Sequence, residues 1–295
     1  MALLRSPRFH RQVDIPTPQL TARDRQIIRH VFRHRFLRST HIAALVGGSR
    51  QQTLRRLQRL YHHGYLDRPR AQIEYYQRGS QAMVYGLGNK GMALLEQEDG
   101  IPQRKLDWTA QNRTATRFFM EHTLAVAETM VALECCCRKQ GIELIHYSDN
   151  ALKWSVPVRY EDATVTVGVV PDRVFGLQHS DKPGEIAWFF LEADRATMPV
   201  QRRGFKQSSF TRKLVAYQET WRRKVLADDF PRFRVLTVTT SPERVEHLLK
   251  ANRIISAGKG LGLFLFAHQR QFHYLADVLS LPILNGRGEM ITLAE

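Results

Sequence analysis

The spacing of apolar side chains predicts three helices near the start of the chain. Apolar residues recur every three to four positions in three successive segments, which is the period of a helix with one buried face. Residues that favour helix N-caps precede these segments, namely Thr21, either Ser39 or Thr40, and Ser49. A Gly47-Gly48 turn follows the second segment. The predicted helices cover about 21–34, 39–46 and 49–62.

Two strand-like segments follow the third predicted helix. The segments 65–77 and 82–87 contain β-favouring residues, and the turn-forming residues 78–81 join them as a hairpin. A fourth helix is expected to start near Asn89. Two short helices joined by a Gly-containing turn are the signature of a helix-turn-helix, and the hairpin after them is interpreted as a wing. The pattern therefore predicts a winged helix-turn-helix over 21–97.

The third predicted helix has two chemically different faces. Its apolar side, at 100° per residue, is expected to face the core and carries Leu54, Leu57, Leu60 and Tyr61. Its opposite side carries amide and guanidinium groups suited to base edges and phosphates, namely Gln51, Gln52, Arg55, Arg56 and Arg59. The predicted wing adds cations expected to reach the flanking backbone or the minor groove, namely Arg68, Arg70 and Arg78.

The distribution of charge supports this interpretation. The 295 residues include 44 Lys and Arg against 28 Asp and Glu, a net charge of +16. Residues 1–95 hold sixteen Arg and one Lys against four acidic residues, a net charge of +13, whereas the rest of the chain carries +3. Concentrated positive charge is typical of proteins that bind a polyanion, because phosphate contacts release condensed counterions. Double-stranded DNA is therefore the predicted partner; a protein–protein module or a simply solubilising charge is the alternative.

Polar segments divide the rest of the chain. Residues 1–20 carry Arg and Pro without periodicity and are interpreted as a basic flexible arm. The polar segment 98–112, which contains Gly and Pro, is interpreted as a linker. Beyond it, a long helix over about 114–139 precedes strands and further helices, which predicts an α/β domain with a mixed sheet over 113–295. The expected strands are 143–147, 153–158, 164–170, 173–178, 186–194, 233–240 and 261–267, with helices over 208–226 and 242–255.

Cysteine usage and hydropathy exclude other classes. The three cysteines, Cys135, Cys136 and Cys137, are consecutive, which suits neither a disulfide framework nor a shared metal and fits a reducing compartment. No apolar run approaches the roughly 18 residues of a membrane span. The first 18 residues lack the apolar core of a secretory signal. We therefore expect a cytoplasmic protein with no membrane partner.

Two carboxylates end an apolar strand in the second domain. In the predicted strand, alternation places Trp188, Phe190, Glu192 and Asp194 on one face. Both faces begin apolar, so the strand is predicted to be buried and central. Buried carboxylates are costly unless a cation or a strong partner compensates their charge. The end of this strand is therefore a candidate functional site.

A third carboxylate is expected beside them. Asp172 precedes the strand 173–178, and a turn-rich connection joins that strand to the strand 186–194. Pairing as a hairpin brings Asp172 beside Glu192 and Asp194, and clustered carboxylate oxygens suit magnesium or manganese. The alternative is an ion-paired strand end with Arg173 and Arg195 as partners.

These motifs resemble known families. Pro171-Asp172 followed by Glu192-x-Asp194, within a helix, strand hairpin, helix, strand order, resembles the restriction-endonuclease-like PD-(D/E)xK nucleases. With the predicted winged helix, the runs FLEADR at 190–195 and KLxxY at 213–217 are similar to the replication-relaxation family. The resemblance covers roughly residues 21–255. It implies a bacterial protein, associated with the nucleoid or a plasmid, and a role in plasmid replication and DNA relaxation.

The nuclease resemblance carries over to individual residues. Asp172 matches the first metal carboxylate and Glu192 the second, and the position expected to hold lysine is Asp194. The resemblance thus implies Mg²⁺ or Mn²⁺ at Asp172, Glu192 and Asp194. Lys213, at the edge of the apolar stripe on the predicted helix 208–226, is a candidate to replace the missing lysine. The predicted catalytic set is therefore Asp172, Glu192, Asp194 and Lys213.

Three functions remain open from the sequence. The first is a duplex-DNA-binding factor in the replication, relaxation or mobilisation of a plasmid or mobile element, with a relaxase, replication or other mobile-element protein as partner. The second is a magnesium-dependent endonuclease or nickase. The third is a transcriptional regulator, which predicts a dimer bound to a promoter palindrome.

Overall fold

The structure is a computed structural model that describes residues 8–12, 16, 18–74, 81–102, 107–147, 152–160, 163–200 and 209–294. The chain divides into two compact units, Met1–Ala127 and Glu128–Glu295. We call them unit 1 and unit 2 and describe each by itself. The helix α7, Arg117–Gln140, crosses from one unit into the other.

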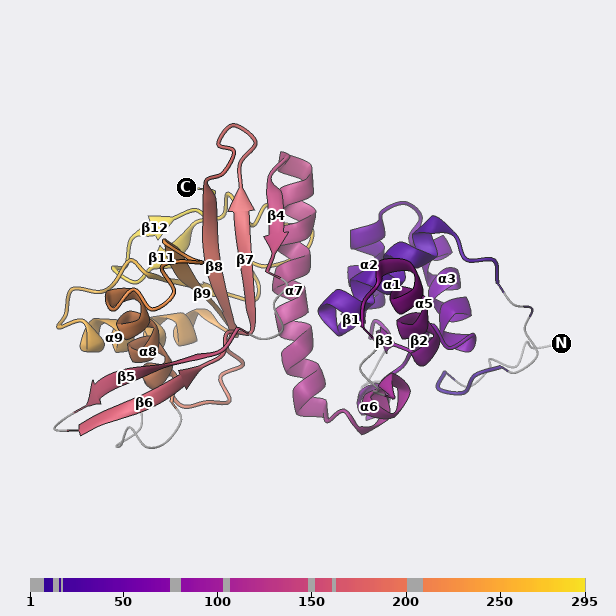
Figure 1. Ribbon diagram of the computed structural model, residues 1–295, viewed down its shortest axis with the longest axis horizontal. Coiled ribbons are helices and arrows are strands. Elements are labelled where there is room, and N and C mark those ends of the chain that lie inside the picture. The colour runs from indigo at the N-terminus through magenta and orange to yellow at the C-terminus, as the bar shows by residue number, and fades with distance from the viewer. Residues whose placement is uncertain are drawn as a thin grey trace. The chain divides into compact units, whose positions relative to one another are not determined.

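Unit 1 contains short helices and a small sheet (Figure 1). Its elements are α1 Ala22–His34, β1 Phe36–Arg38, α2 Ser39–Val46, α3 Arg50–His62, β2 Leu66–Asp67, the 3-10 helix η1 Arg70–Gln72, β3 Val84–Leu87, α5 Asn89–Asp99 and α6 Trp108–Thr114. The sheet has the order β1-β3-β2, and both pairings are antiparallel.

Two of the three N-caps predicted for unit 1 are present. Thr21 caps α1 in a reciprocal pair, since its backbone N–H donates to Asp24 Oδ2 at 2.9 Å and its hydroxyl accepts from Asp24 N. Ser49 caps α3 by accepting from the backbone N–H of Gln52. The expected cap at Ser39 or Thr40 is wrong, because α2 already includes Ser39 and its N-cap is Arg38.

The predicted strand over 65–77 is wrong for most of its described length. Only β2 is extended, and η1 follows it after Pro69, which lacks the N–H that a strand ladder requires. The side chain of Gln72 takes the place of a strand there: its Nε2 donates to Val84 O at 2.9 Å, and its Oε1 accepts from Val84 N at 2.8 Å. On its other edge β3 pairs with β1, a strand that the sequence pattern did not predict.

Residues of the predicted arm contact unit 1, and parts of the predicted linker are helical. In the arm, Arg11 Nη2 donates to Asp67 Oδ1 at 3.1 Å and to Leu66 O at 3.3 Å. In the segment predicted as a linker, α5 continues to Asp99 and α6 begins at Trp108.

Unit 2 is an α/β unit with a mixed sheet. Its elements after α7 are β4 Glu143–His146, β5 Trp154–Tyr160, β6 Ala163–Val169, β7 Arg173–Gln178, β8 Ile186–Ala193, α8 Phe210–Arg222, β9 Phe233–Thr239, α9 Pro242–Ile255, β10 Phe264–His268, β11 Ile283–Asn285 and β12 Met290–Ile291. The main sheet has the order β12-β11-β10-β9-β8-β7-β4. The strands β8, β9 and β10 are parallel, and the other pairs in this sheet are antiparallel.

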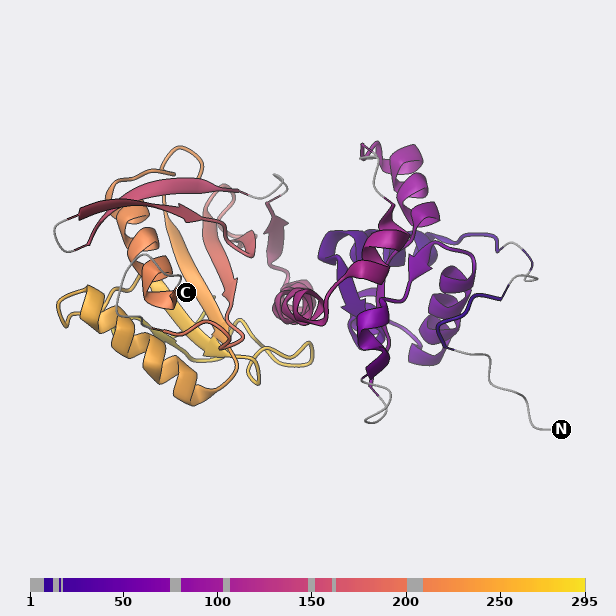
Figure 2. The ribbon, with the colours of Figure 1, turned by 90° about the horizontal axis from the view of Figure 1, so that it is seen from below.

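The core of unit 2 packs against the face of β8 that carries Phe190. β8 lies between β7 and β9, as its hydrophobic pattern predicts. Phe190 is fully buried and packs with Leu214 and Tyr217 of α8, and the paired strands β5 and β6 cover the same cluster. Figures 1 and 2 show this two-stranded ribbon beside α8. Burying a side chain of this size stabilises the fold by about 1.5–3 kcal/mol.

The cysteines are buried in α7 of unit 2. Cys136 Sγ lies 3.1 Å from Asp277 Oδ1, which also accepts from Gln140 Nε2 at 2.6 Å. Burial raises the pKa of Cys137 to about 12, so its thiol is unreactive at neutral pH.

In the described part of the chain, no helix combines the length and apolarity needed to cross a bilayer.

Candidate functional site

The outer face of α3 is the first candidate site. The four side chains Gln51, Gln52, Arg55 and Arg59 are exposed along it. The expectation that Leu54 faces the core is wrong, because 38% of it is exposed. Thr53 is buried in its place, next to Leu57 on the inner stripe, and its hydroxyl donates to Ser49 O at 3.1 Å. A single buried hydroxyl that is hydrogen-bonded in this way costs little.

Arg56 is held within the fold of unit 1. Its Nη2 donates to Asp24 Oδ2 at 3.0 Å, its Nε lies 3.0 Å from Asp24 Oδ1, and it also contacts the hydroxyl of Thr21. The side chain of Asp24 is 7% exposed. Arg56 therefore fastens α3 to the N-terminus of α1, a contact that the helical pattern of α3 alone does not reveal.

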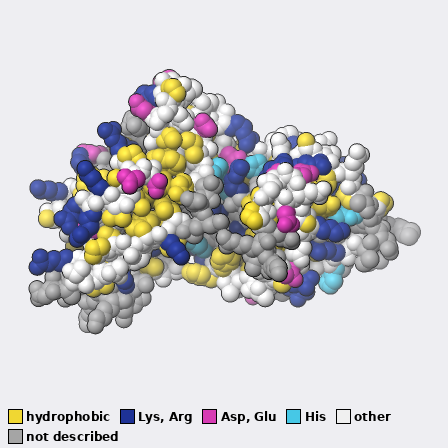
Figure 3. All heavy atoms as spheres, viewed as in Figure 1, with side chains coloured by type: hydrophobic (Ala, Val, Ile, Leu, Met, Phe, Trp, Pro, Cys, Tyr) yellow, Lys and Arg dark blue, Asp and Glu magenta, His cyan; other side chains and the backbone are white. Residues whose placement is uncertain are grey.

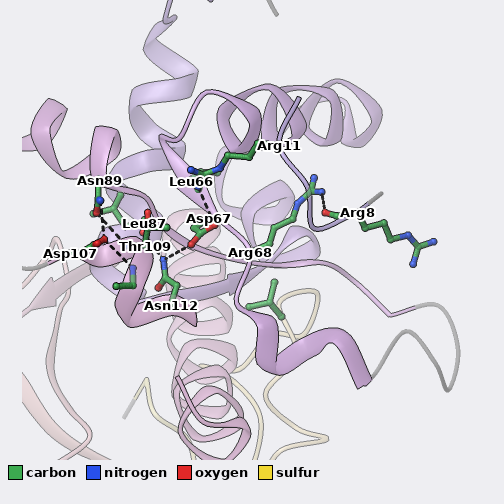
Figure 4. Close-up of polar contacts among 12 residues, drawn as sticks. Arg8, Arg11, Leu66, Asp67, Arg68, Leu87, Asn89, Asp107, Thr109 and Asn112 are labelled. Carbon is green, nitrogen blue, oxygen red and sulfur yellow. Dashed lines mark hydrogen bonds and ion pairs between the residues drawn. The ribbon is translucent and has the colours of Figure 1, made fainter. Parts of the chain in front are cut away.

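The cations predicted for the wing have different positions. The guanidinium of Arg68 lies 4.0 Å from the ring centroid of Tyr61 and donates to the Tyr85 hydroxyl at 3.2 Å. It also donates to the carbonyl of Arg8 (Figure 4). Arg70 is exposed on η1. Arg78 lies outside the described residues. On the face of unit 1 that Figure 3 displays, groups of Lys and Arg side chains lie at the surface with histidines nearby.

A buried polar network joins elements of unit 1, and Figure 4 shows part of it. Asn112, which is fully buried, donates to Leu87 O at 2.8 Å and to Asp67 Oδ2 at 3.5 Å. Its Oδ1 accepts from Arg35 Nη1 at 2.6 Å. Burial lowers the pKa of Arg35 to about 10, and the carboxylate of Asp67 opposes that shift. The network connects the end of α1, β2, β3 and α6.

The second candidate site lies where β7 and β8 meet in unit 2. Their antiparallel register pairs Arg173 with Leu191, which places Asp172 beside the end of β8. The backbone N–H of Asp172 donates to Leu191 O at 3.0 Å, and Asp172 Oδ2 accepts from Ala193 N at 2.7 Å. The predicted hairpin between these segments is therefore present.

Glu192 is the centre of this site. Its side chain is 2% exposed, and both of its oxygens have partners from α8. Lys213 Nζ donates to Oε2 at 2.6 Å, and the Tyr217 hydroxyl donates to Oε1 at 2.7 Å. Burial raises the pKa of Glu192. Burial lowers the pKa of Lys213, but the charge of Glu192 and its hydrogen bond act in the opposite direction, and the pKa of Lys213 is raised overall. The charges of Asp172 and Asp194 act on Lys213 in the same direction.

Asp194 is occupied by other partners. Arg244 Nε donates to its Oδ2 at 2.8 Å and Arg244 Nη2 to its Oδ1 at 3.2 Å. The Thr239 hydroxyl donates to Oδ2 at 2.8 Å, and Ala196 N donates to Oδ1 at 3.1 Å. The structure thus brings Asp172, Glu192 and Lys213 together and engages Asp194 in a buried ion pair with α9.

Sequence reasoning missed three residues of this arrangement. Tyr217 was given no role at the carboxylates, although it ends the KLxxY run and its spacing of four from Lys213 places both on one face of α8. Arg244 and Thr239 gave no local signal, because they reach Asp194 only through the parallel pairing of β9 with β8 and the return of α9.

The chemistry of the site suits a hard divalent cation. Mg²⁺ is commonly bound by one or two carboxylates, with water and substrate phosphate completing its octahedron. Asp172 and Glu192 supply two carboxylates, and each oxygen of Glu192 has a second lone pair beyond its hydrogen bond from α8. Asp194 does not fit this ligand set, since its two oxygens accept from Arg244, Thr239 and Ala196.

A match to a known protein family includes most residues of both candidate sites. A family model described as "Replication-relaxation" matches residues 28–232. The matched range includes α3, Asp172, Glu192 and Lys213, and it ends before Arg244. No curated protein and no solved structure matches the chain.

Proposed function

The chain belongs to the replication-relaxation family, and we propose that it binds duplex DNA through unit 1 and acts in the replication, relaxation or mobilisation of a plasmid or other mobile element. The element order α1-β1-α2-α3-β2-β3, with a three-stranded antiparallel sheet, supports a winged helix-turn-helix. In this proposal α3 enters the major groove. A relaxase, a replication protein or another mobile-element protein is the proposed protein partner.

One observation carries this proposal: the outer face of α3 is exposed and holds Gln and Arg side chains. Arg55 and Arg59 are on this face, and they have the donors that guanine O6 and N7 or phosphate oxygens accept from. The net charge of +13 on residues 1–95 supplies the field that attracts a duplex.

Fluorescence anisotropy with a labelled duplex tests the proposal. The full chain is expected to bind with an affinity that falls with salt, and the double variant Arg55→Gln/Arg59→Gln to bind more weakly. If both side chains contact phosphates, the slope of log K against log salt falls by about two. Lys250→Gln, on an exposed position of α9 in unit 2, is the matched charge control. Equal affinity and salt slope for all three proteins would falsify the proposal. Dimeric binding to one promoter palindrome supports the regulator instead.

A second candidate function, metal-dependent cleavage of a DNA phosphodiester, is favoured by the meeting of Asp172, Glu192 and Lys213. The order α7, β7–β8 hairpin, α8, β9 supports the resemblance to PD-(D/E)xK nucleases. Mg²⁺ at Asp172 and Glu192 would supply Lewis-acid chemistry when bound. Lys213, which reaches the site from α8 rather than from β8, would place a positive charge where negative charge develops on the phosphate.

A supercoiled-plasmid assay with Mg²⁺ or Mn²⁺ tests this second function. Nicking that is lost in both Asp172→Asn and Glu192→Gln, but retained in Asp181→Asn, supports an enzyme. Asp181 is an exposed carboxylate in the connection between β7 and β8 and serves as the matched control. Intact plasmid at high protein concentration, with normal DNA binding, shows instead a binding factor without catalysis.

A further inference from the structure

Unit 1 contains a cavity at the C-terminal end of α3. Its volume is about 440 Å³. Four parts of unit 1 form its wall: the arm, the end of α3, the start of α5, and α6 with its N-cap. The residues that line it are Arg11, His62, His63, Gly64, Asn89, Lys90, Asp107, Thr109 and Arg113. Figure 4 shows Arg11, Asn89, Asp107 and Thr109 from this wall.

The wall of the cavity carries excess positive charge. Arg11, Lys90 and Arg113 face one carboxylate, Asp107. That carboxylate already has hydrogen-bond partners within unit 1. Its Oδ1 accepts from Ala110 N at 3.0 Å and from Asn89 Nδ2 at 2.9 Å. These hydrogen bonds hold the pKa of Asp107 below its usual range, so it remains ionised and fixed in place.

Two of the three cations remain available to a ligand. Arg11 is already paired with Asp67. Within the described residues, the side chains of Lys90 and Arg113 form neither a hydrogen bond nor an ion pair at contact distance, and both are exposed. Lys90 is the second residue of α5, a helix of 11 residues, so the positive end of the helix dipole adds to its charge.

Two histidines, His62 and His63, also line the cavity. His62 Nδ1 accepts from the backbone N–H of Gln12 at 3.1 Å, so the neutral ring carries its proton on Nε2. That Nε2 is buried and has no hydrogen-bond partner, and the same is true of Nε2 of His63. Each of these atoms exposes less than 1 Å². The cations of the wall, rather than the histidines, therefore contact a ligand in the cavity.

The cavity also continues the exposed face of α3. Arg55, Arg59 and His62 are spaced four and three residues apart, which places them on one side of the helix. A ligand that follows this face toward the end of α3 reaches the cavity.

We propose that this cavity binds a phosphate group, held by Lys90 and Arg113. In the complex with DNA, the group is a backbone phosphate next to the duplex that α3 contacts; this assignment rests on the proposed function. A free phosphate or nucleotide presents the same chemistry, and the experiment separates the two sources.

The test uses the full chain with Lys90→Gln/Arg113→Gln, Lys90→Arg/Arg113→Lys and, as the matched charge control, Lys250→Gln. Anisotropy with a labelled duplex is measured across a salt series. Loss of one phosphate contact lowers the slope of log K against log salt by about one and weakens binding about eightfold near ~0.1 M salt. The charge-preserving pair and Lys250→Gln are expected to keep the original slope. Since the two replaced side chains are exposed, thermal unfolding is expected to be unchanged, and it is recorded for each variant.

A second experiment tests whether the cavity binds a free ligand. Inorganic phosphate and pyrophosphate are titrated by calorimetry against the original chain and the double variant. If DNA binding is unaffected but saturable phosphate binding is lost in the double variant, the occupant is a free phosphate and the DNA assignment is overturned. If neither DNA nor phosphate binding changes, the cavity is not a phosphate site. If the original chain shows no salt-dependent duplex binding, the proposed function fails, and the phosphate titration alone then decides the cavity.

Discussion

Replacing Arg56 with methionine separates a structural role from a DNA-reading role on α3. The spacing of α3 assigns Arg56 to the DNA-binding face, whereas the structure pairs it with Asp24 of α1. We expect Arg56→Met to destabilise unit 1 and to leave DNA affinity within about twofold, when both are measured well below the unfolding temperature. Arg55→Met, one residue earlier and exposed, is expected to do the opposite.

The expected destabilisation follows from the burial of Asp24. Its side chain is 7% exposed and that of Arg56 is 26% exposed, so the pair is largely screened from water. Hydrogen bonds to a charged group contribute about 1.5–3 kcal/mol, and Asp24 keeps its bonds to Thr21 in the variant. A loss of about 2 kcal/mol lowers the unfolding midpoint by roughly 8 °C for a unit of this size.

A double-mutant cycle isolates the pair. Thermal or urea unfolding is measured for Arg56→Met, Asp24→Asn and the double variant, and the coupling free energy is expected to be about 1–2 kcal/mol, because the two groups are in direct contact. DNA affinity is measured on the same proteins. A variant Arg56→Met that unfolds at the original temperature but binds DNA tenfold more weakly would refute the structural assignment.

Three further predictions concern other parts of the fold. Gly86→Ala is expected to destabilise unit 1 by about 1–3 kcal/mol in urea unfolding, because a Cβ there would lie 2.8 Å from Asn112 Oδ1 and 2.9 Å from the Phe36 ring; unchanged stability contradicts the packing around β3. Because the pKa of Glu192 is raised in the folded state, its carboxyl favours folding below the unfolded pKa of about 4.3, and this contribution is lost as pH rises through the folded value. Stability measured from pH 4 to 8 should therefore fall more for the original chain than for Glu192→Gln, and parallel curves count against a raised pKa. Cys137, with a pKa of about 12, should resist alkylation at pH 8 until the chain unfolds, as followed by mass spectrometry; rapid labelling of the native protein contradicts its burial.

Local pattern was sufficient for most elements of this protein. The caps at Thr21 and Ser49, the exposed Arg55 and Arg59, and the buried central position of β8 all follow from side-chain spacing, because a helix or strand exposes its faces at a fixed period. The approach of Lys213 to Glu192 was also predicted, since its helix has an apolar stripe that must face the sheet. Membership in the replication-relaxation family follows from short motifs in the right order.

Tertiary structure decided which charged groups are paired. Arg56 and Arg55 are neighbours with the same side chain, yet only Arg56 meets a buried carboxylate, and that carboxylate belongs to another helix. Asp194 likewise accepts from Arg244, fifty residues later, instead of joining Asp172 and Glu192. Periodicity reports which side of its own element a residue occupies. Whether a charge there is paired or available to a ligand depends on the elements that pack beside it, and spacing along the chain does not contain that information.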